Sequence, residues 1–356
     1  MKYLISAFLL LFIHSCCSRT DATGSQSNVH EKMNSVYYWK TVFDPDSADI
    51  AFLARHDVGR IYLRMFDVAQ EPYSYQPEDA TYPNASVRID DATIALFSDT
   101  LAGKEFVPVV YITLEALKAM ADHEEILATN IVTRVSNMCS YYRIPNVAEM
   151  QLDCDWTAST QDSFFRLCDS VKSIIGNMDL PWQLSATIRL HQLSGKVPPV
   201  DRGVLMVYNT GSFNDPDANN SIIDARDVEP YLKHLADYPL HLDVAYPTYS
   251  WQLLFRRRQF VGLLNSLDLT DSTKFSHRHT NRYIATEEIP YNNIIIRPGD
   301  MIRSEVADYT DIVSVKELID RRLADKPHSN ILYHLDSSNL SNYTSDEISN
   351  ILSADR

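Results

Sequence analysis

Cysteine is scarce in this chain of 356 residues, and its copies have no regular spacing. Cys16 and Cys17 stand near the amino terminus, and Cys139, Cys154 and Cys168 lie in the body of the chain. An odd number of body cysteines without close pairs argues against a zinc site and against a scaffold held by disulfides. We therefore expect buried thiols, with one disulfide still permitted outside the cytoplasm.

Glycine and positive charge are also in short supply. None of the 9 glycines forms a glycine-rich turn between a predicted strand and a predicted helix, so a nucleotide-binding sheet has little support. The formal net charge of -15 argues against a nucleic-acid partner, because phosphate binding needs clustered Lys and Arg. The basic run Arg256-Arg257-Arg258 is predicted on the solvated face of a helix. We expect no metal ion and no cofactor.

The amino terminus is predicted to be a targeting segment that does not belong to the folded domain. Lys2 is followed by an apolar run over residues 3–13 that is too short to span a bilayer, which predicts a secretory signal. The segment Ile13-His14-Ser15-Cys16 resembles the lipobox of bacterial lipoproteins, although His14 departs from the usual small residue, and the resemblance implies a lipid on Cys16. We predict a signal peptide over residues 1–16 and a flexible tether over 17–34. The expected location is the bacterial cell envelope, anchored by lipid in the outer membrane, with a soluble secreted protein as the alternative.

The remaining residues, 35–356, are predicted to form one domain, because no linker rich in Pro, Gly or Ser interrupts them. Short strand-like runs alternate with helical patterns, which predicts a single (β/α)8 barrel of the α/β class, with an open doubly wound sheet as the alternative. An insertion from about residue 268 to 311 precedes the last helix and strand. The predicted strands cover residues 36–41, 60–67, 106–114, 149–155, 183–190, 204–209, 241–247 and 331–336. The predicted helices cover residues 49–55, 91–101, 126–142, 161–175, 225–236, 249–264, 315–324 and 345–352.

The fourth predicted strand ends with two carboxylates, Asp153 and Asp155. Because side chains alternate along a strand, both carboxylates share one face, while Cys154 and Trp156 share the other. Like charges and desolvation both oppose burying such a pair, so the pair is a candidate site. The alternative is that the two aspartates neutralise Arg or Lys inside the barrel or cap the next helix.

Polar residues also gather at the predicted carboxyl ends of the other strands, where barrels of this class build their active sites. Because these ends converge, we predict a ligand pocket there. The residues that we expect to contact its ligand are Arg64, Tyr111, Arg189, Tyr208, Asn209, Tyr246, Trp251 and Asp336.

The segment from Met150 to Thr157 resembles the D-x-x-D-x-D-x-E signature of the family-eighteen, chitinase-like glycoside hydrolases. Residues 205–209, Leu-Met-Val-Tyr-Asn, are similar to the M-x-Y-D pattern on the sixth strand of that family. The resemblance covers about three strands, and it implies a (β/α)8 barrel acting on a carbohydrate. Met150, Thr157 and Asn209 depart from the signature, and Thr157 stands where the family has its general acid. A threonine hydroxyl is far too weak an acid to protonate a glycosidic oxygen.

Carboxylates on other strands therefore have to be considered as acid and base. Glycosidases pair one protonated acid with one ionised partner. Asp155 is the first candidate, and Arg64 or Arg189 would keep one carboxylate of a pair ionised, unless these arginines merely neutralise a polar barrel layer. The catalytic candidates are Asp155, Asp153, Asp243 and Glu115, with Asp336 as a further possible partner.

Aromatic residues near the strand ends, such as Trp251 and Tyr249 after the seventh strand, could stack on sugar rings, whereas Trp156 is expected to pack under the helices. The loop over residues 210–221 is rich in Asp and Asn but lacks the spacing of a known calcium loop. The sequence favours a glycoside-hydrolase-like enzyme of the cell envelope that acts on or binds a carbohydrate. The alternatives are a carbohydrate-binding lipoprotein that has lost the acid and a structural envelope lipoprotein.

Overall fold

The computed structural model describes residues 32–356 except 75, 265–266, 293, 325 and 355–356. The part that begins at Lys32 forms one compact unit. The predicted signal peptide, Cys16 and most of the predicted tether lie outside the described residues.

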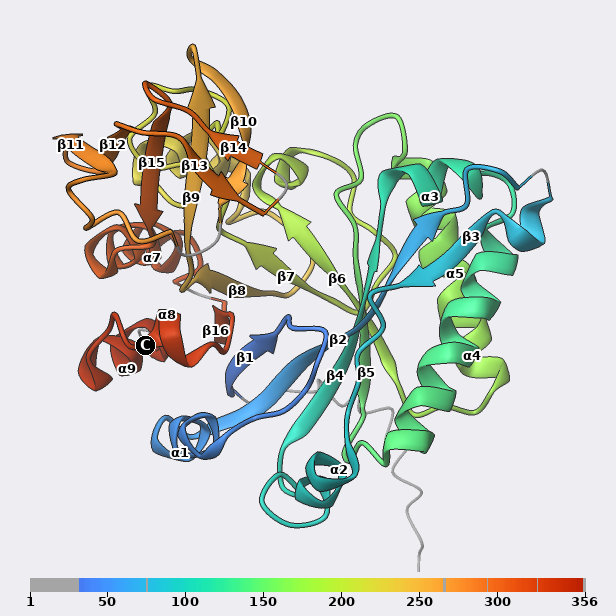
Figure 1. The fold of residues 1–356 in the computed structure, drawn as a ribbon. Helices are drawn as coiled ribbons and strands as arrows, with labels where there is room; N and C mark the ends of the chain where they lie inside the picture. The colour runs from blue at the N-terminus through green and yellow to red at the C-terminus, as the bar shows by residue number, and fades with distance from the viewer. Residues whose placement is uncertain (1–31, 75, 265–266, 293, 325, 355–356) are drawn as a thin grey trace, which may run out of the picture. The chain divides into compact units, whose positions relative to one another are not determined.

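Eight parallel strands close into a barrel, because β1 pairs with β2 on one side and with β16 on the other (Figure 1). One further strand, β3 (Thr81–Asn84), pairs antiparallel with β2. The predicted (β/α)8 barrel is confirmed, and the open sheet is excluded. The barrel strands are β1 (Asn34–Tyr38), β2 (Val58–Gln70), β4 (Glu105–Ile112), β5 (Glu149–Asp153), β6 (Gln183–Arg189), β7 (Arg202–Met206), β8 (Leu242–Pro247) and β16 (Asn330–Tyr333).

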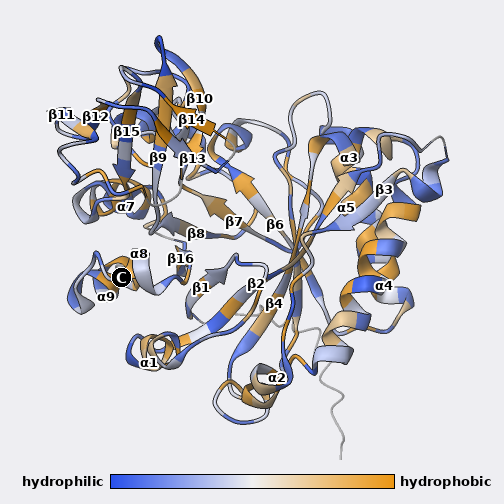
Figure 2. Cartoon of the chain, viewed as in Figure 1, coloured by the Kyte–Doolittle hydropathy of each residue, from blue (hydrophilic) through white to orange (hydrophobic). Residues whose placement is uncertain are grey.

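Helices cover the outside of the barrel with one apolar face each. In α4, the buried residues Leu127, Ile131 and Val135 recur at helical spacing, and Figure 2 shows hydrophobic and hydrophilic residues interleaved along this helix. Trp156 is 2% exposed and stacks on Phe164 of α5, which confirms that it packs under the helices. The helices are α1 (Ser47–Arg55), α2 (Asp91–Phe97), α3 (Leu114–Ala119), α4 (Glu124–Tyr142), α5 (Gln161–Asn177), α6 (Ala225–Val228), α7 (Tyr309–Arg322), α8 (Ser337–Leu340) and α9 (Ser345–Leu352).

The insertion before the last helix and strand is larger than predicted and starts with a β-hairpin. Residues 249–264 were predicted as a helix, and this prediction is wrong, because they form β9 (Ser250–Arg256) and β10 (Gln259–Leu264). Arg257 and Arg258 form the turn, with φ angles of 49° and 66°. The basic run therefore lies at a hairpin turn and not on a helix. The other inserted strands are β11 (Phe275–His279), β12 (Arg282–Ala285), β13 (Ile289–Tyr291), β14 (Ile294–Ile296) and β15 (Met301–Val306).

Further elements differ from the predicted ones. The helix predicted over residues 225–236 is the short α6 followed by a 3-10 segment, and α3, α8 and β3 were not predicted at all. Cys139, Cys154 and Cys168 are free and buried, as expected, and burial raises the pKa of Cys139 to about 12. Within the described residues, no helix is long and apolar enough to cross a membrane.

Candidate functional site

Arg189, the last residue of β6, brings the two carboxylates of the fourth barrel strand together. Its Nη2 donates to Oδ1 of Asp153 over 2.9 Å, and its Nε donates to Oδ1 of Asp155. The alternation expected around Cys154 is therefore present, because both carboxylates lie on the Arg189 side and Cys154 is buried on the other. The backbone N–H of Arg189 also donates to Gln192, whose side chain holds the carbonyl of Trp156. These bonds fix the end of β6 against the end of β5.

The two carboxylates have different environments. Asp153 is 1% exposed and accepts a hydrogen bond from Oγ1 of Thr187 over 2.6 Å. Burial raises the pKa of Asp153, and the charge of Asp155 adds to the rise, while Arg189 and Thr187 oppose it. The side chain of Asp155 is 49% exposed. Asp155 is therefore the carboxylate that a ligand can reach, and Asp153 supports it from within the barrel.

Aromatic rings form a layer next to these carboxylates, inside the carboxyl end of the barrel. Tyr208 stacks on Tyr333 with ring centres 4.5 Å apart, and Tyr333 also contacts Trp39 and Tyr249. The guanidinium of Arg189 lies 5.7 Å from the centre of the Tyr208 ring. Burial raises the pKa of Tyr208 to about 12, so its hydroxyl stays protonated near neutral pH. Our sequence interpretation missed Tyr333, although it lies two residues after Ile331 and so shares its face on the last strand.

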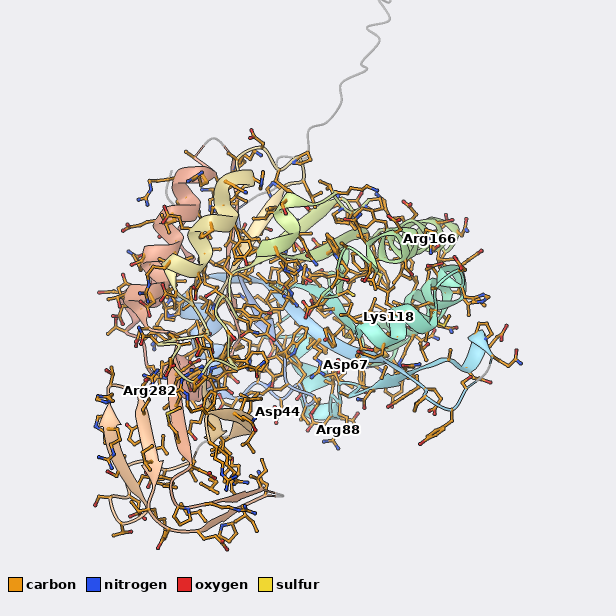
Figure 3. The ribbon with its side chains drawn as sticks, turned by 90° about the horizontal axis from the view of Figure 1, so that it is seen from above. Asp44, Asp67, Arg88, Lys118, Arg166 and Arg282 are labelled. Atoms are coloured by element: carbon orange, nitrogen blue, oxygen red, sulfur yellow. The ribbon has the colours of Figure 1, made fainter. Side chains whose placement is uncertain are left out.

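A second ion pair lies in the second half of β2, just past the position at which β1 ends beside it. Arg64 donates to Asp67 through Nε over 2.9 Å and through Nη2 over 2.5 Å, and its guanidinium also lies 5.4 Å from the ring centre of Trp39. The β-bulge between Arg64 and Phe66 explains how residues three apart face the same way. Arg64 therefore lies in the middle of its strand and beside the carboxyl end of β1, where it donates to the carbonyl of Trp39 and its charge is neutralised by Asp67. Figure 3 shows Asp67 in the barrel, well apart from Arg282 in the inserted sheet.

A cavity of about 360 Å³ opens between the ends of β6 and β7. Among the described residues that line it, Asp155 is the one carboxylate. Arg189, Tyr208 and Asn209, all predicted to contact a ligand, also line this cavity. Asn209 has a φ of 54°, and its Oδ1 accepts a hydrogen bond from the hydroxyl of Tyr249 over 2.7 Å. The cavity wall is completed by Leu190, His191, Met206, Thr210 and Tyr231.

Thr157, at the position of the general acid in the resembled signature, belongs to the turn that starts α5. Its backbone N–H donates to Oγ1 of Thr160 over 3.0 Å, and its hydroxyl lies 3.0 Å from that of Ser159. Thr157 is exposed and is not among the residues that line the cavity. The position at which the resembled family has its general acid is therefore occupied here by a threonine that stabilises a turn.

Two predicted site residues lie elsewhere. Asp243 is the second residue of β8 and so lies at the amino end of the barrel, where it pairs with Arg202 and accepts a hydrogen bond from the backbone N–H of Ser329. Tyr246 is fully buried and belongs to the hydrophobic core between the strands and the helices. Our placement of Asp243 at the carboxyl end was wrong, because it is too near the start of its strand. Tyr246 does lie near the carboxyl end of β8, but its side chain faces the helices and not the predicted pocket.

The other candidates lie around the site without lining the cavity. Tyr111 is half-buried and pairs in register with Asp153; burial and the charge of Asp155 raise its pKa to about 12. Glu115 is exposed in the first turn of α3. Asp336 caps α8 and forms an ion pair of 3.0 Å with Lys40.

Trp251, the remaining aromatic candidate, is only partly exposed and lies at the start of β9. Its ring packs edge-on against Tyr249 with centres 5.7 Å apart, and its indole N–H donates to Glu305 over 2.5 Å. Trp251 is therefore joined to the aromatic layer through Tyr249 and has its polar atom already bonded.

The loop over residues 210–221 is held by arginines of the insertion. Arg282 donates to the carbonyls of Pro216, Asp217 and Ala218, and Arg303 donates to that of Asp215. These carbonyl oxygens, which a calcium ion would need as ligands, thus already accept hydrogen bonds from guanidinium groups. In the described part of the chain, no group of three or more His, Cys, Asp or Glu side chains is arranged to hold a metal ion.

Comparison with known proteins identifies solved structures that have the same fold. No sequence family and no curated protein matches the chain. A chitinase from Chromobacterium violaceum matches in structure with a TM-score of 0.54 at 10% identity, covering 87% of this chain and 97% of that one. A family 18 glycoside hydrolase from Paenibacillus barengoltzii, an N-acetylglucosaminidase, matches with a TM-score of 0.51 at 10% identity, covering 90% and 99%.

A third match is a chitinase catalytic domain from Ostrinia furnacalis, solved in complex with the oligosaccharide (NAG)5. Its TM-score is 0.52 at 10% identity, and the match covers 90% of this chain and 95% of that one. Identities this low show the fold alone. The chain therefore has the (β/α)8 barrel fold of the chitinase-like, family-eighteen glycoside hydrolases.

Proposed function

We propose that the carboxyl end of the barrel binds a carbohydrate without hydrolysing it. The observation that carries the proposal is the cavity at the ends of β6 and β7, in which Asp155 is the one carboxylate among the described lining residues and is already paired with Arg189. Glycoside cleavage needs a proton donor beside the leaving oxygen as well as a second polar group. Thr157 supplies no such donor, since its hydroxyl is too weak an acid and takes part in a turn.

The chemistry of the cavity suits a sugar. Asp155, Arg189 and Asn209 offer charged and amide groups that can bond sugar hydroxyls, and Tyr208 offers an aromatic ring beside them. Structural neighbours include a chitinase and an N-acetylglucosaminidase, so oligomers of N-acetylglucosamine are the first probes to test.

Affinity and product release should be measured together on N-acetylglucosamine oligomers and on a panel of host and bacterial cell-wall glycans. We expect wild-type protein to bind at least one of them and to release no product. Asp155→Asn keeps the shape of the side chain but removes its charge, so it should weaken binding by about tenfold or more. Thr157→Ala should leave the affinity nearly unchanged, and so should Asp169→Asn, a matched control on the exposed side of α5.

Two results would contradict the proposal. Product release by the wild type that is lost in Asp155→Asn would establish a glycoside hydrolase. The absence of both binding and product release across the panel would favour a structural role.

The proposal also includes an envelope location, which rests on the lipobox-like segment ending at Cys16. Cys16→Ser should move the protein from the membrane fraction to the soluble fraction, whereas Cys17→Ser, the matched control, should not. Unchanged fractionation of Cys16→Ser would contradict lipid anchoring at this residue.

A further inference from the structure

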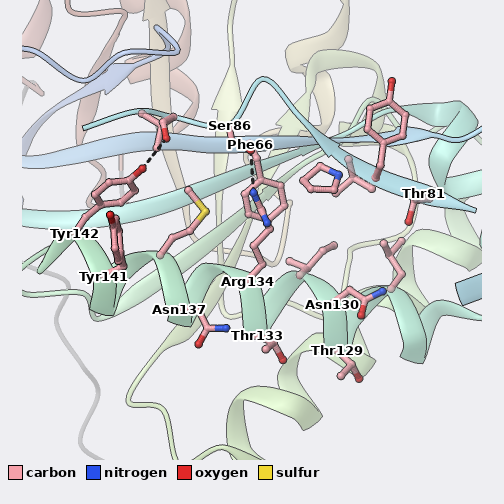
Figure 4. Close-up of a pocket in the computed structure, with 17 residues that line it drawn as sticks. Phe66, Thr81, Ser86, Thr129, Asn130, Thr133, Arg134, Asn137, Tyr141 and Tyr142 are labelled. Carbon is pink, nitrogen blue, oxygen red and sulfur yellow. Dashed lines mark hydrogen bonds between the residues drawn. The ribbon is translucent and has the colours of Figure 1, made fainter. Parts of the chain in front are cut away.

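A second and larger hollow lies on the outside of the barrel, between α4 and the paired strands β2 and β3 (Figure 4). Its volume is about 840 Å³, which is within the range of small-molecule sites. It shares no lining residue with the cavity at Asp155. We name it the α4 groove, and nothing in the proposed function uses it.

Arg134 is the one charged residue among the described residues that line the α4 groove. Figure 4 shows its side chain reaching from α4 toward Phe66 and Ser86. Its Nη2 donates to the hydroxyl of Ser86 over 3.1 Å, and its guanidinium lies 5.1 Å from the ring centre of Phe66. Its Nε is buried and has no hydrogen-bond partner in the described chain.

The charge of Arg134 is therefore not neutralised by the described part of the protein. No Asp or Glu is among the described lining residues of the groove, although the chain as a whole has a formal net charge of -15. A partly buried cation is normally paired, because desolvation without a counter-charge is unfavourable. An anionic group in the groove would supply the missing counter-charge.

The rest of the lining indicates what kind of molecule carries that anion. Tyr141 is 77% exposed and Tyr82 is 43% exposed, and both border the groove. Figure 4 shows Tyr141 and Tyr142 at one end of the groove and Thr81, which precedes Tyr82, at the other. Exposed rings of this kind can stack on a sugar face. Hydroxyl and amide groups that can bond sugar hydroxyls are supplied by Thr81, Ser86, Thr129, Asn130, Thr133 and Asn137.

We propose that the α4 groove binds an acidic saccharide, with the carboxylate of a hexuronic acid unit placed next to Arg134 and the sugar rings lying against the tyrosines. Arginine suits this role because its guanidinium is always charged and can donate two hydrogen bonds to one carboxylate. The α4 groove is separate from the barrel cavity, so either binding proposal can be wrong while the other is right.

The main comparison uses two oligosaccharide probes on the wild type and on two variants of α4. The probes are a galacturonic acid oligomer and the same oligomer with its carboxyl groups reduced to alcohols. Asn130→Asp adds a carboxylate one helical turn before Arg134, where it pairs with Arg134 and competes with the ligand. Ser140→Asp adds the same charge on α4 outside the groove lining and is the matched control. Because Asn130→Asp keeps Arg134, the variant should fold as well as the wild type, which a thermal unfolding curve checks.

We expect the wild type and Ser140→Asp to bind the acidic oligomer at least about tenfold more tightly than the reduced one, and Asn130→Asp to lose this preference. Asp155→Asn should leave this binding unchanged, which separates the groove from the barrel cavity. Equal affinity for the two oligomers, or full binding by Asn130→Asp, would overturn the proposal. Tighter binding of a short peptide with a free carboxyl terminus would overturn the assignment to a saccharide.

Discussion

Arg189 joins a buried carboxylate to an exposed one, since it donates to Asp153 over 2.9 Å and also to Asp155. The side chain of Asp153 is 2% exposed and that of Asp155 is 49% exposed. Water can solvate Asp155 if the arginine is lost, but it cannot reach Asp153. The guanidinium of Arg189 thus positions Asp155, which a ligand can reach, and also balances the buried charge of Asp153, which stabilises the fold.

Removing Arg189 should therefore destabilise the protein strongly. Arg189→Met keeps much of the side-chain bulk but leaves Asp153 without its counter-charge, and breaking a buried pair in this way costs about 3–5 kcal/mol. Urea unfolding measures the change. Adding Asp153→Asn should restore part of the loss, because the unpaired charge is then gone.

The matched control is Arg258→Met, which breaks the pair of Arg258 with Asp217. Both side chains of this pair are about two-thirds exposed, at 68% and 67%, so the change in stability should be small. An equally large loss in Arg258→Met, or no loss in Arg189→Met, would contradict the role of Arg189.

The barrel could be predicted from the sequence because most of its strands are short buried runs followed by a helical pattern, although β8 is followed by the inserted hairpin instead. Strands such as β5 and β7 are buried along their whole length, which is typical of parallel sheets covered by helices. The insertion could not be predicted in the same way. The apolar residues of β9 and β10 flank Arg257 and Arg258, and this pair carries none of the usual hairpin signal of Asn-Gly.

The pairing of Asp155 with Arg189 could be predicted in part from the sequence. Asp243 and Tyr246, which were misplaced, show what strand periodicity cannot predict. Period-two alternation groups residues by face, but it does not say which face lines the barrel or which end of a strand a residue reaches. Asp243 and Tyr246 were misplaced for these two reasons. Tyr231, which lines the cavity, comes from a 3-10 segment whose position depends on tertiary packing.

Asp243 should make stability depend on pH in the acid range. Burial raises its pKa, but the hydrogen bond with His241, the charge of Arg202 and the N–H of Ser329 outweigh burial and lower the pKa to about 2. A carboxyl with a lower pKa in the folded state stabilises the fold above its unfolded pKa of about 3.9. That contribution, about 2 kcal/mol, is lost as the pH falls from about 4 to about 2.

Urea unfolding of the wild type and of Asp243→Asn between pH 2 and pH 6 tests this expectation. The variant should be less stable near pH 6 and should show a smaller loss of stability on acidification. If both proteins lose stability in parallel over this range, Asp243 is not the group responsible.

The stack of Tyr208 on Tyr333 should matter for the proposed carbohydrate site. Tyr208→Ala removes the ring beside Arg189 and should weaken binding of an N-acetylglucosamine oligomer by about tenfold, as expected for the loss of an aromatic contact. Tyr208→Phe keeps the ring and should have a smaller effect. Isothermal titration calorimetry measures both, with Tyr141→Ala in the α4 groove as the control that should not change this affinity. An unchanged affinity in Tyr208→Ala would place the sugar elsewhere.

The hairpin between β9 and β10 offers a test of backbone strain. Arg257 and Arg258 both have positive φ angles, of 49° and 66°, in a conformation that side chains with a Cβ atom rarely adopt. Two-residue turns of this kind favour Asn followed by Gly. The double variant Arg257→Asn, Arg258→Gly should therefore raise the melting temperature by about 2 °C, even though it removes the exposed ion pair with Asp217. Arg258→Ala removes the same ion pair but keeps the Cβ atom, so it should give no increase. A melting temperature that falls in the double variant would show that the arginines stabilise the hairpin through contacts that outweigh the strain.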